Sequence, residues 1–220
     1  MSDREIAPPV DRHIDIDPDR TGLVVFDLLE CYRPAAEAAG AIGPARRLIE
    51  GCRAVGVPVF WARADHRADG MDFARARTDT DASFRPWSAE NPPPTRPPHG
   101  SGSPMLQPLH ELGMQPNDYD VPKHRWSAFH GTHLELSLRA RDIDTILLIG
   151  GSTHVGIAST AFAARDLDFT VVVVRDALTG FPEQRNYFVE SVFPRMALVR
   201  TVEQVLTALG EPASSPEETS

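Results

Sequence analysis

A tight turn between a predicted buried strand and a predicted helix is the part of this sequence best suited to chemistry. The run T-I-L-L-I-G-G-S-T-H-V-G-I-A-S-T-A, from Thr145 to Ala161, joins an apolar strand, a Gly-Gly turn and the start of a helix. Such a turn directs several backbone N–H groups and the positive end of a helix dipole at one point. An oxyanion that develops during acyl transfer needs donors at such a point. The turn is therefore a candidate catalytic centre.

Asp27 is a second candidate, because it directly follows the apolar run Leu23 to Phe26. A carboxylate at the end of a buried strand is costly unless it is paired or functional. Taken alone, the residue leaves two interpretations about equally open. It is either a structural cap or ion pair, or a catalytic group.

Three segments, in the same order along the chain, resemble the isochorismatase-like, or cysteine hydrolase, superfamily. The turn resembles its nucleophile motif G-x-x-T-x-x-C-V-x-x-T-A, with Gly156 in the place of the cysteine. The run G-L-V-V-F-D-L-L-E-C-Y resembles the opening strand that ends in a catalytic aspartate, here Asp27. The run D-Y-D-V-P-K-H-R-W-S-A-F-H-G-T-H-L resembles K-x-R-x-S-A-F-x-x-T-x-L and places the catalytic lysine at Lys123. The resemblance spans roughly Arg20 to Leu209.

This resemblance implies how the site is built. Lys123 would lie beside Asp27, hold the charge of the carboxylate and bind a polar group of the substrate. The peptide bond Gly151-Ser152 would be cis and would turn a backbone N–H towards an oxyanion. Gly156 has no side chain, so the usual thiol nucleophile would be absent.

True isochorismatases resemble this chain in having glycine at the cysteine position within a similar local run, here Thr153-His154-Val155-Gly156. The resemblance implies thiol-independent hydrolysis of a vinyl ether in a small, anionic metabolite. Asp27 would act as a general acid on the vinyl carbon, and water would add to the resulting oxocarbenium ion. The glycine would leave room for substrate or water. The substrate-binding Gln and Arg of isochorismatases have no match within Ala64–Pro104, so the substrate stays open.

Two other functions remain open at this point. An amide or other C–N hydrolase would use a different nucleophile, or a water that Asp27 activates as a base. A binding protein would have kept the fold and lost the chemistry. A decayed site, however, has no reason to retain a costly buried pair of Asp27 and Lys123.

Further side chains near these segments are candidates for binding a substrate. They are Ser152, His154, Val155, Trp126, Phe129, Arg125 and Trp61. His154 would donate a hydrogen bond to the substrate or would simply be an exposed residue at a helix start. The three aromatic residues would form pocket walls, although aromatic side chains are more often part of a core.

Cys31 is an alternative nucleophile, because it lies shortly after the predicted catalytic aspartate. Nothing near it in the sequence supplies a base or a helix N-terminus to activate the thiol. Packing is therefore the favoured interpretation of this cysteine.

Asp65, His66 and His99 raise the question of a metal site. The metal-binding nicotinamidases of the superfamily carry Asp-x-His after the same strand. Here the residue two positions after Asp65 is Arg67, so that pattern is broken. We predict no metal and no cofactor.

The composition indicates one globular domain rather than a membrane or nucleic-acid-binding protein. The chain has 220 residues, 41% of them hydrophobic, and a net charge of −9, which argues against nucleic acid and anionic membranes as partners. No apolar run approaches the roughly 20 residues of a membrane span. Two cysteines without tight spacing and an N-terminus without a signal-peptide pattern favour the cytoplasm. The expected partner is a small-molecule substrate, and the resemblance implies a homodimer or higher homo-oligomer.

The boundaries of the domain follow from composition. Residues 1–20 are polar and predicted to form an extended arm, and residues 21–210 form the hydrolase domain. Within it, residues 64–104 form a long proline-rich loop, which covers a site, mediates assembly or is a solvated insertion. Residues 211–220 are predicted to be a disordered tail.

Short apolar runs alternate with helical patterns along the domain. The predicted strands are Leu23–Asp27, Val57–Ala62, Tyr119–Pro122, Thr145–Ile149, Thr170–Arg175 and Ala197–Val199. The predicted helices are Pro44–Val55, Met105–Leu112, His133–Ala140, Val155–Leu167, Glu183–Val192 and Thr201–Leu209. This alternation predicts an α/β fold, a three-layer α/β/α domain with a mainly parallel, Rossmann-like sheet of about six strands. Asp27, Lys123 and Gly150 should then meet at the carboxyl ends of the strands, where the strand order reverses.

Overall fold

Six apolar runs form one parallel sheet in the computed structural model, which describes residues 15–74 and 100–210. The strands are β1 (Thr21–Phe26), β2 (Val59–Ala64), β3 (Tyr119–Lys123), β4 (Thr145–Gly150), β5 (Thr170–Leu178) and β6 (Leu198–Arg200). Their order across the sheet is β3-β2-β1-β4-β5-β6, and each neighbouring pair is parallel. The predicted fold class is confirmed.

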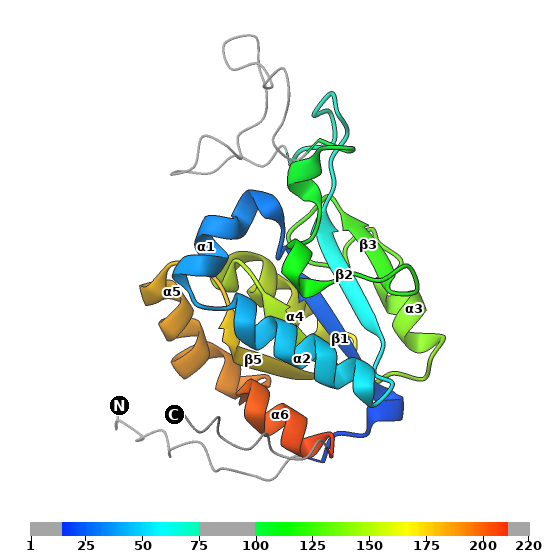
Figure 1. Cartoon of the computed structure of the whole chain (residues 1–220), viewed down its shortest axis with the longest axis vertical. Helices are drawn as coiled ribbons and strands as arrows, with labels where there is room; N and C mark the ends of the chain where they lie inside the picture. Colours follow the sequence, from blue (N-terminus) through cyan, green and yellow to red (C-terminus); the bar gives the residue numbers. More distant parts are fainter. Residues whose placement is uncertain (1–14, 75–99, 211–220) are drawn as a thin grey trace, which may run out of the picture.

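Helices cover both faces of this sheet. They are α1 (Arg33–Ala38), α2 (Ile42–Ala54), α3 (Leu134–Arg139), α4 (Ala158–Asp166), α5 (Pro182–Tyr187) and α6 (Val202–Ala208). In Figure 1, α2 and α6 lie in front of the sheet and α4 lies behind it. A turn of π-helix, Thr153–Ile157, precedes α4, and a second one, Phe188–Val192, follows α5. None of the helices in the described ranges is long and apolar enough to cross a membrane.

The two faces of the sheet carry separate cores, because successive strand residues point to opposite sides. In β1, Leu23 and Val25 pack with residues of α2 and α6. Val24 and Phe26 pack with residues of α3 and α4. All six residues of β1 are buried, as expected for a central parallel strand that is covered on both faces.

The strand order reverses between β1 and β4. The chain runs outward from β1 through β2 to β3 and then returns to place β4 on the other side of β1. At the carboxyl ends, Phe26 pairs with Gly150, and Ala64 pairs with Lys123. Open α/β sheets bind their ligands at this edge and at this reversal.

The segment between the proline-rich loop and β3 is not one helix, so the predicted helix Met105–Leu112 is wrong. Two short 3₁₀ turns, Pro104–Leu106 and His110–Leu112, flank an extended stretch. The Leu109 N–H donates to the Leu28 carbonyl at 2.9 Å, and Pro108 forms a bridge with Leu29. A proline has no N–H and interrupts a helix, and the chain leaving β1 satisfies the backbone groups instead.

Residues 15–20 also depart from the predicted extended arm. Ile16 is only 4% exposed and packs in the core beneath α2 and α6. Residues Pro18–Arg20 form a 3₁₀ turn, and the Arg20 guanidinium pairs with Asp144. Residues 1–14 of the arm, residues 75–99 of the proline-rich loop and the predicted tail lie outside the described residues.

Candidate active site

Asp27 and Lys123 meet at the carboxyl edge of the sheet. The Asp27 Oδ2 atom accepts a hydrogen bond from the Lys123 ammonium at 2.6 Å, and Oδ1 accepts one from the Ala64 N–H at 2.7 Å. The side chains of Lys123 and Asp27 are only 5% and 9% exposed. Ala64 and Lys123 are paired strand ends, so the sheet register itself places the two donors side by side. The structure thus brings two predicted site residues together as a buried ion pair.

The backbone of Asp27 directs its carboxylate towards those donors. Its φ angle is 46°, in the left-handed region that aspartate tolerates better than most residues. The Asp27 N–H still donates to the Ala62 carbonyl at 2.9 Å, so the residue continues the pairing between β1 and β2. The change of backbone direction at this point sends the side chain towards the ends of β2 and β3.

The turn after β4 packs against the end of β1 and is hydrogen-bonded to the residue that follows β5. Gly150 has a φ of 109°, and a Cβ there would lie 1.9 Å from the Phe26 carbonyl oxygen, so only glycine fits. The Gly151-Ser152 peptide bond is cis. The N–H and the hydroxyl of Thr153 both donate to the Thr179 carbonyl, at 2.9 and 2.6 Å.

These contacts reduce the number of backbone N–H groups at the turn that could donate to a ligand. The Thr153 N–H is used by Thr179, and the Val155 N–H donates to the Ser152 carbonyl at 3.2 Å. Neither group is therefore aimed at a ligand. The prediction that several N–H groups converge on one point does not hold for these two.

Other residues of the resembling motifs have structural roles. The Ala128 N–H donates to the Thr160 hydroxyl at 3.0 Å, and the Thr132 hydroxyl donates to the Ala128 carbonyl at 2.5 Å. The first bond ties the segment that follows Lys123 to helix α4. The two motifs therefore hold each other in place next to the ion pair.

The space over Gly156 is filled by the ring of Phe26. A Cβ at residue 156 would lie 2.2 Å from Cε1 and 2.5 Å from Cζ of that ring. Phe26 is 1% exposed. The expectation that the glycine leaves room for substrate or water is wrong, because a protein side chain occupies that room.

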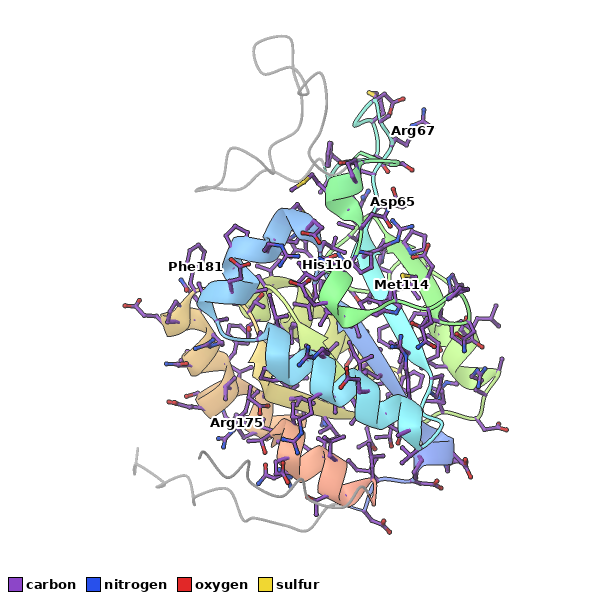
Figure 2. The ribbon with its side chains drawn as sticks, in the orientation of Figure 1. Asp65, Arg67, His110, Met114, Arg175 and Phe181 are labelled. Atoms are coloured by element: carbon purple, nitrogen blue, oxygen red, sulfur yellow. The ribbon has the colours of Figure 1, made fainter. Side chains whose placement is uncertain are left out.

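Ser152, His154 and Val155 lie at the turn itself. The Ser152 hydroxyl and His154 Nδ1 are 3.1 Å apart, and all three residues are half-buried. The His154 ring lies 6.1 Å from the ring of Phe181, which is 69% exposed at the start of α5 (Figure 2). These three residues stay candidates for contact with a substrate.

Trp61 is a core residue and Phe129 is half-buried against the core, and neither ring faces Lys123, so their predicted role as pocket walls is wrong. Trp61 is 1% exposed, and its indole N–H donates to Asp118 at 2.9 Å, before the start of β3. The Phe129 ring lies 5.6 Å from the Phe169 ring, directly before β5. Both side chains thus point to the amino-terminal edge of the sheet, opposite Lys123.

Arg125 and Trp126 lie on the surface beside Lys123. A guanidinium N–H of Arg125 donates to the backbone carbonyl of Asp72 at 2.8 Å, which turns it towards the segment after β2. Trp126 is 50% exposed. Both stay candidates for contact with a ligand.

Sequence reasoning missed two side chains at the site. Phe26 contacts Lys123, with the ammonium 4.2 Å from the ring centroid. Tyr32 lies close enough to Asp27 that burial and the charge of the carboxylate together raise the pKa of its phenol. Both residues belong to the run from Gly22 to Tyr32, within which the sequence pattern pointed only to Asp27 and Cys31.

Cys31 is in the wrong environment for a nucleophile. Burial, and then the nearby charge of Asp27, raise the pKa of its thiol to about 12. Because the thiolate is the reactive form, we expect alkylation of Cys31 by iodoacetamide at about pH 8 to be roughly 10³-fold slower than that of free cysteine. Mass spectrometry of the labelled protein measures this rate. Labelling as fast as that of free cysteine would contradict the assignment and make Cys31 a nucleophile candidate again.

One group of side chains next to the site has the donor types of a metal centre. The ligand atoms of His66, Asp72 and His124 all lie within 4.8 Å of one another. Two imidazoles and a carboxylate can bind a divalent transition metal. Asp65 instead pairs with an arginine of β2, and His99 lies outside the described residues. The absence of a metal stays a prediction.

The Isochorismatase domain matches residues 21–204 of the chain. The chain belongs to the isochorismatase family. It is an isochorismatase-family hydrolase, and the Asp27–Lys123 pair lies within the matched region.

Relatives of this isochorismatase-family chain cover nearly its whole length. The uncharacterized isochorismatase family protein YecD of Escherichia coli O157:H7 is 36% identical over 201 residues, covering 89% of this chain and 100% of YecD. The ureidoacrylate amidohydrolase RutB of Rhizobium rhizogenes is 27% identical over 207 residues, covering 84% of this chain and 83% of RutB. A solved structure of an isochorismatase family protein from Burkholderia thailandensis matches with a TM-score of 0.74 at 28% identity, covering 90% of this chain and 100% of that one.

Proposed function

We propose that this hydrolase cleaves a vinyl ether in a small, anionic metabolite without a thiol, with Asp27 as the residue that transfers the proton. The observation that carries the proposal is a buried Asp27–Lys123 pair at a site whose residue 156 has no side chain. Acid catalysis followed by addition of water needs no covalent intermediate on the enzyme. The glycine is compatible with that chemistry and incompatible with a cysteine nucleophile.

Lys123 supplies the proton in this mechanism. Both oxygens of Asp27 accept hydrogen bonds, which is the arrangement of an ionised carboxylate. An acid role therefore requires a proton to pass from the Lys123 ammonium to Asp27 along their 2.6 Å bond. Asp27 then transfers this proton to the terminal vinyl carbon, where the electrons of the C=C bond form the new C–H bond.

Addition of water completes the reaction. It attacks the oxocarbenium carbon and loses a proton, which returns to the neutral amine of Lys123. The hemiketal then breaks its C–O bond to the leaving group, and its hydroxyl proton passes to the leaving oxygen, which releases a ketone and an alcohol. We propose that His154 at the turn and the exposed Arg125 bind the anionic or hydroxyl groups of the substrate, and that Ser152, Val155 and Trp126 contact the remainder.

The composition of the chain supports a specific role for Lys123. It is the only lysine among the 22 lysine and arginine residues. Arginine is the basic residue at the other 21 positions, including β2, where the half-buried Arg63 pairs with Asp120. Lysine differs from arginine in presenting a compact ammonium that can give up its proton. Retention of a single lysine beside Asp27 favours a function that arginine cannot perform.

A second function, hydrolysis of an amide or another C–N bond, has its own support. The ionised arrangement of Asp27 suits a base that activates water, and the relative RutB is named an amidohydrolase. In this alternative Asp27 takes a proton from the attacking water. The two functions place opposite demands on the same carboxylate. A homo-oligomeric state remains our proposal from the resemblance, and a cytoplasmic location remains our proposal from the cysteine content and the N-terminal sequence.

A substrate panel assayed with a cysteine-free variant tests the proposal. We expect Cys31→Ser/Cys52→Ser to keep the activity of the parent, because Gly156 removes the expected thiol and Cys31 is not activated. Isochorismate and other enol-ether carboxylates form one arm, with release of pyruvate as the readout. Amide and ureido carboxylates form the other arm, with release of ammonia or amine as the readout.

The outcomes separate the functions. Turnover of enol ethers supports the proposal, and turnover of amides alone favours the second function. A metabolite that raises the melting temperature but is never converted indicates a binding protein. Loss of activity in the folded cysteine-free variant contradicts the thiol-independent mechanism.

A further inference from the structure

Phe26 lies between the two features that define the site. One edge of its ring, Cε1 and Cζ, faces the Cα of Gly156. Its ring face lies 4.2 Å from the Lys123 ammonium. The same buried ring therefore contacts the turn after β4 and the cation that pairs with Asp27.

The backbone of Phe26 cannot move away from Gly156 without breaking the sheet. Phe26 pairs with Ala62 of β2 on one side and with Gly150 of β4 on the other. Its carbonyl also accepts the Gly151 N–H at 3.0 Å. A Cβ at residue 156 would come within 2.5 Å of two ring atoms, far inside van der Waals contact. With its backbone held by the sheet and its ring buried, Phe26 in this orientation and a side chain at residue 156 exclude each other.

The ring also shapes the surroundings of Lys123. The ammonium has three N–H donors. One of them donates to Asp27, with 2.6 Å between Nζ and Oδ2, and the aromatic face lies close to the cation. The negative face of an aromatic ring attracts a cation and is strongest where water is excluded. Lys123 is 5% exposed, so the ring and the carboxylate together hold the ammonium in place.

We propose that Phe26 is a positioning residue for Lys123. Its ring, together with Gly156, also prevents a cysteine side chain from occupying residue 156, so the chemistry of this site does not use a thiol there. The mutual exclusion of the ring and a residue 156 side chain is independent of the proposed function. The positioning of Lys123 matters for turnover only if that function holds. Neither part needs a substrate for its test.

The first experiment restores the cysteine in the Cys31→Ser/Cys52→Ser background. Gly156→Cys alone collides with Phe26, so we expect a melting temperature well below that of the parent and slow alkylation of the new thiol by iodoacetamide. Adding Phe26→Val removes the collision, so we expect recovery of the melting temperature and alkylation at least about 10-fold faster. Gly156→Cys with the parent melting temperature and the same alkylation rate as the double replacement would overturn the proposal.

A smaller replacement keeps this test decisive if both cysteine variants unfold. Gly156→Ala is compared in the parent and in the Phe26→Val background by thermal unfolding. We expect a smaller loss of melting temperature when residue 26 is valine. Equal losses in the two backgrounds overturn the mutual exclusion.

The second experiment measures the position of Lys123 through its reactivity. Because Lys123 is the only lysine, acetic anhydride labels one side-chain amine, which peptide mass spectrometry separates from the N-terminus. Phe26→Leu keeps an apolar residue but removes the aromatic face, so we expect acetylation of Lys123 at least about 10-fold faster than in the parent. Phe129→Leu, which alters a half-buried ring that packs against the core away from the pair, is the matched control and should leave the rate unchanged.

Two results would overturn the positioning role. One is an unchanged acetylation rate in folded Phe26→Leu. The other is an equal increase in Phe129→Leu, which would indicate general loosening of the core. If Phe26→Leu does not fold, Phe26→Met serves as the volume-matched variant, with the same expected rate increase and the same contradicting results.

Discussion

Replacing Asp27 by asparagine is expected to lower turnover of an enol-ether substrate by roughly 10²–10⁴ while most of the binding affinity survives. Asparagine has nearly the same shape as aspartate but carries no transferable proton. The effect should therefore fall on kcat more than on KM. Steady-state kinetics, together with binding of a non-reactive substrate analogue by calorimetry, measure the two quantities separately.

The hydrogen bonds of Asp27 add a structural cost that the experiment must separate. Asp27 accepts from two donors, the Ala64 N–H and the Lys123 ammonium. An asparagine can accept from one of them, and its NH₂ group then faces the other donor, so some loss of stability is expected as well. Thermal unfolding of Asp27→Asn reports that loss. Asp120→Asn, which alters an exposed carboxylate on β3 that pairs with Arg63, is a suitable control.

The results of this experiment bear directly on the proposed mechanism. Near-normal turnover by folded Asp27→Asn would contradict any proton transfer by this residue. Loss of affinity with no turnover in either protein would instead assign Asp27 to a binding site. A similar fall for amide substrates alone would move the assignment from acid to base.

Replacing Lys123 by methionine is expected to destabilise the fold by about 3–5 kcal/mol, because it leaves a buried carboxylate without its charged partner. The two side chains are 5% and 9% exposed, so solvent compensates little for the lost contact. Urea unfolding at neutral pH measures the free energy. We expect the double replacement Asp27→Leu/Lys123→Met to regain much of the loss, because neither charge is then buried.

Lys123→Arg distinguishes charge from geometry at the same position. It keeps the positive charge but places a larger, planar group between the Phe26 ring and Asp27, and it does not readily give up a proton. Turnover should therefore stay low even if the fold survives. A stable, fully active Lys123→Arg enzyme would contradict proton supply by Lys123. A small loss in the free energy of unfolding of Lys123→Met would contradict the assignment of Asp27 and Lys123 as a buried ion pair.

Local patterns predicted the strands well because a strand buried on both faces must be apolar along its length. The same patterns failed at the segment 105–112. Its apolar spacing suited a helix, but Pro108 and pairing with the chain that leaves β1 produced an extended stretch. The deciding contact, Leu109 with Leu28, joins residues far apart in the sequence, and local spacing holds no information about such a pairing.

Trp61 and Phe129 illustrate a second limit. Their types suited either a pocket wall or a core; Trp61 is buried in the core, and Phe129 is half-buried against it. Periodicity along a strand predicts that a side chain is buried, but not whether its ring extends towards the amino or the carboxyl edge of the sheet. That direction depends on partners such as Asp118 and Phe169, which come from other elements.

The order of residues was enough to predict the parallel α/β fold and to place a glycine at residue 156, and the resemblance to the cysteine hydrolase superfamily implied that Asp27 and Lys123 form a pair. These inferences succeed because residue type and strand-end position follow directly from the order of residues, and parallel strands bring their ends to one edge. Only the tertiary structure decided what faces Gly156. A glycine creates a space, but which distant side chain fills it depends on the close packing of three elements. Here the neighbour is Phe26, held by β2 and β4 and lying beside Lys123.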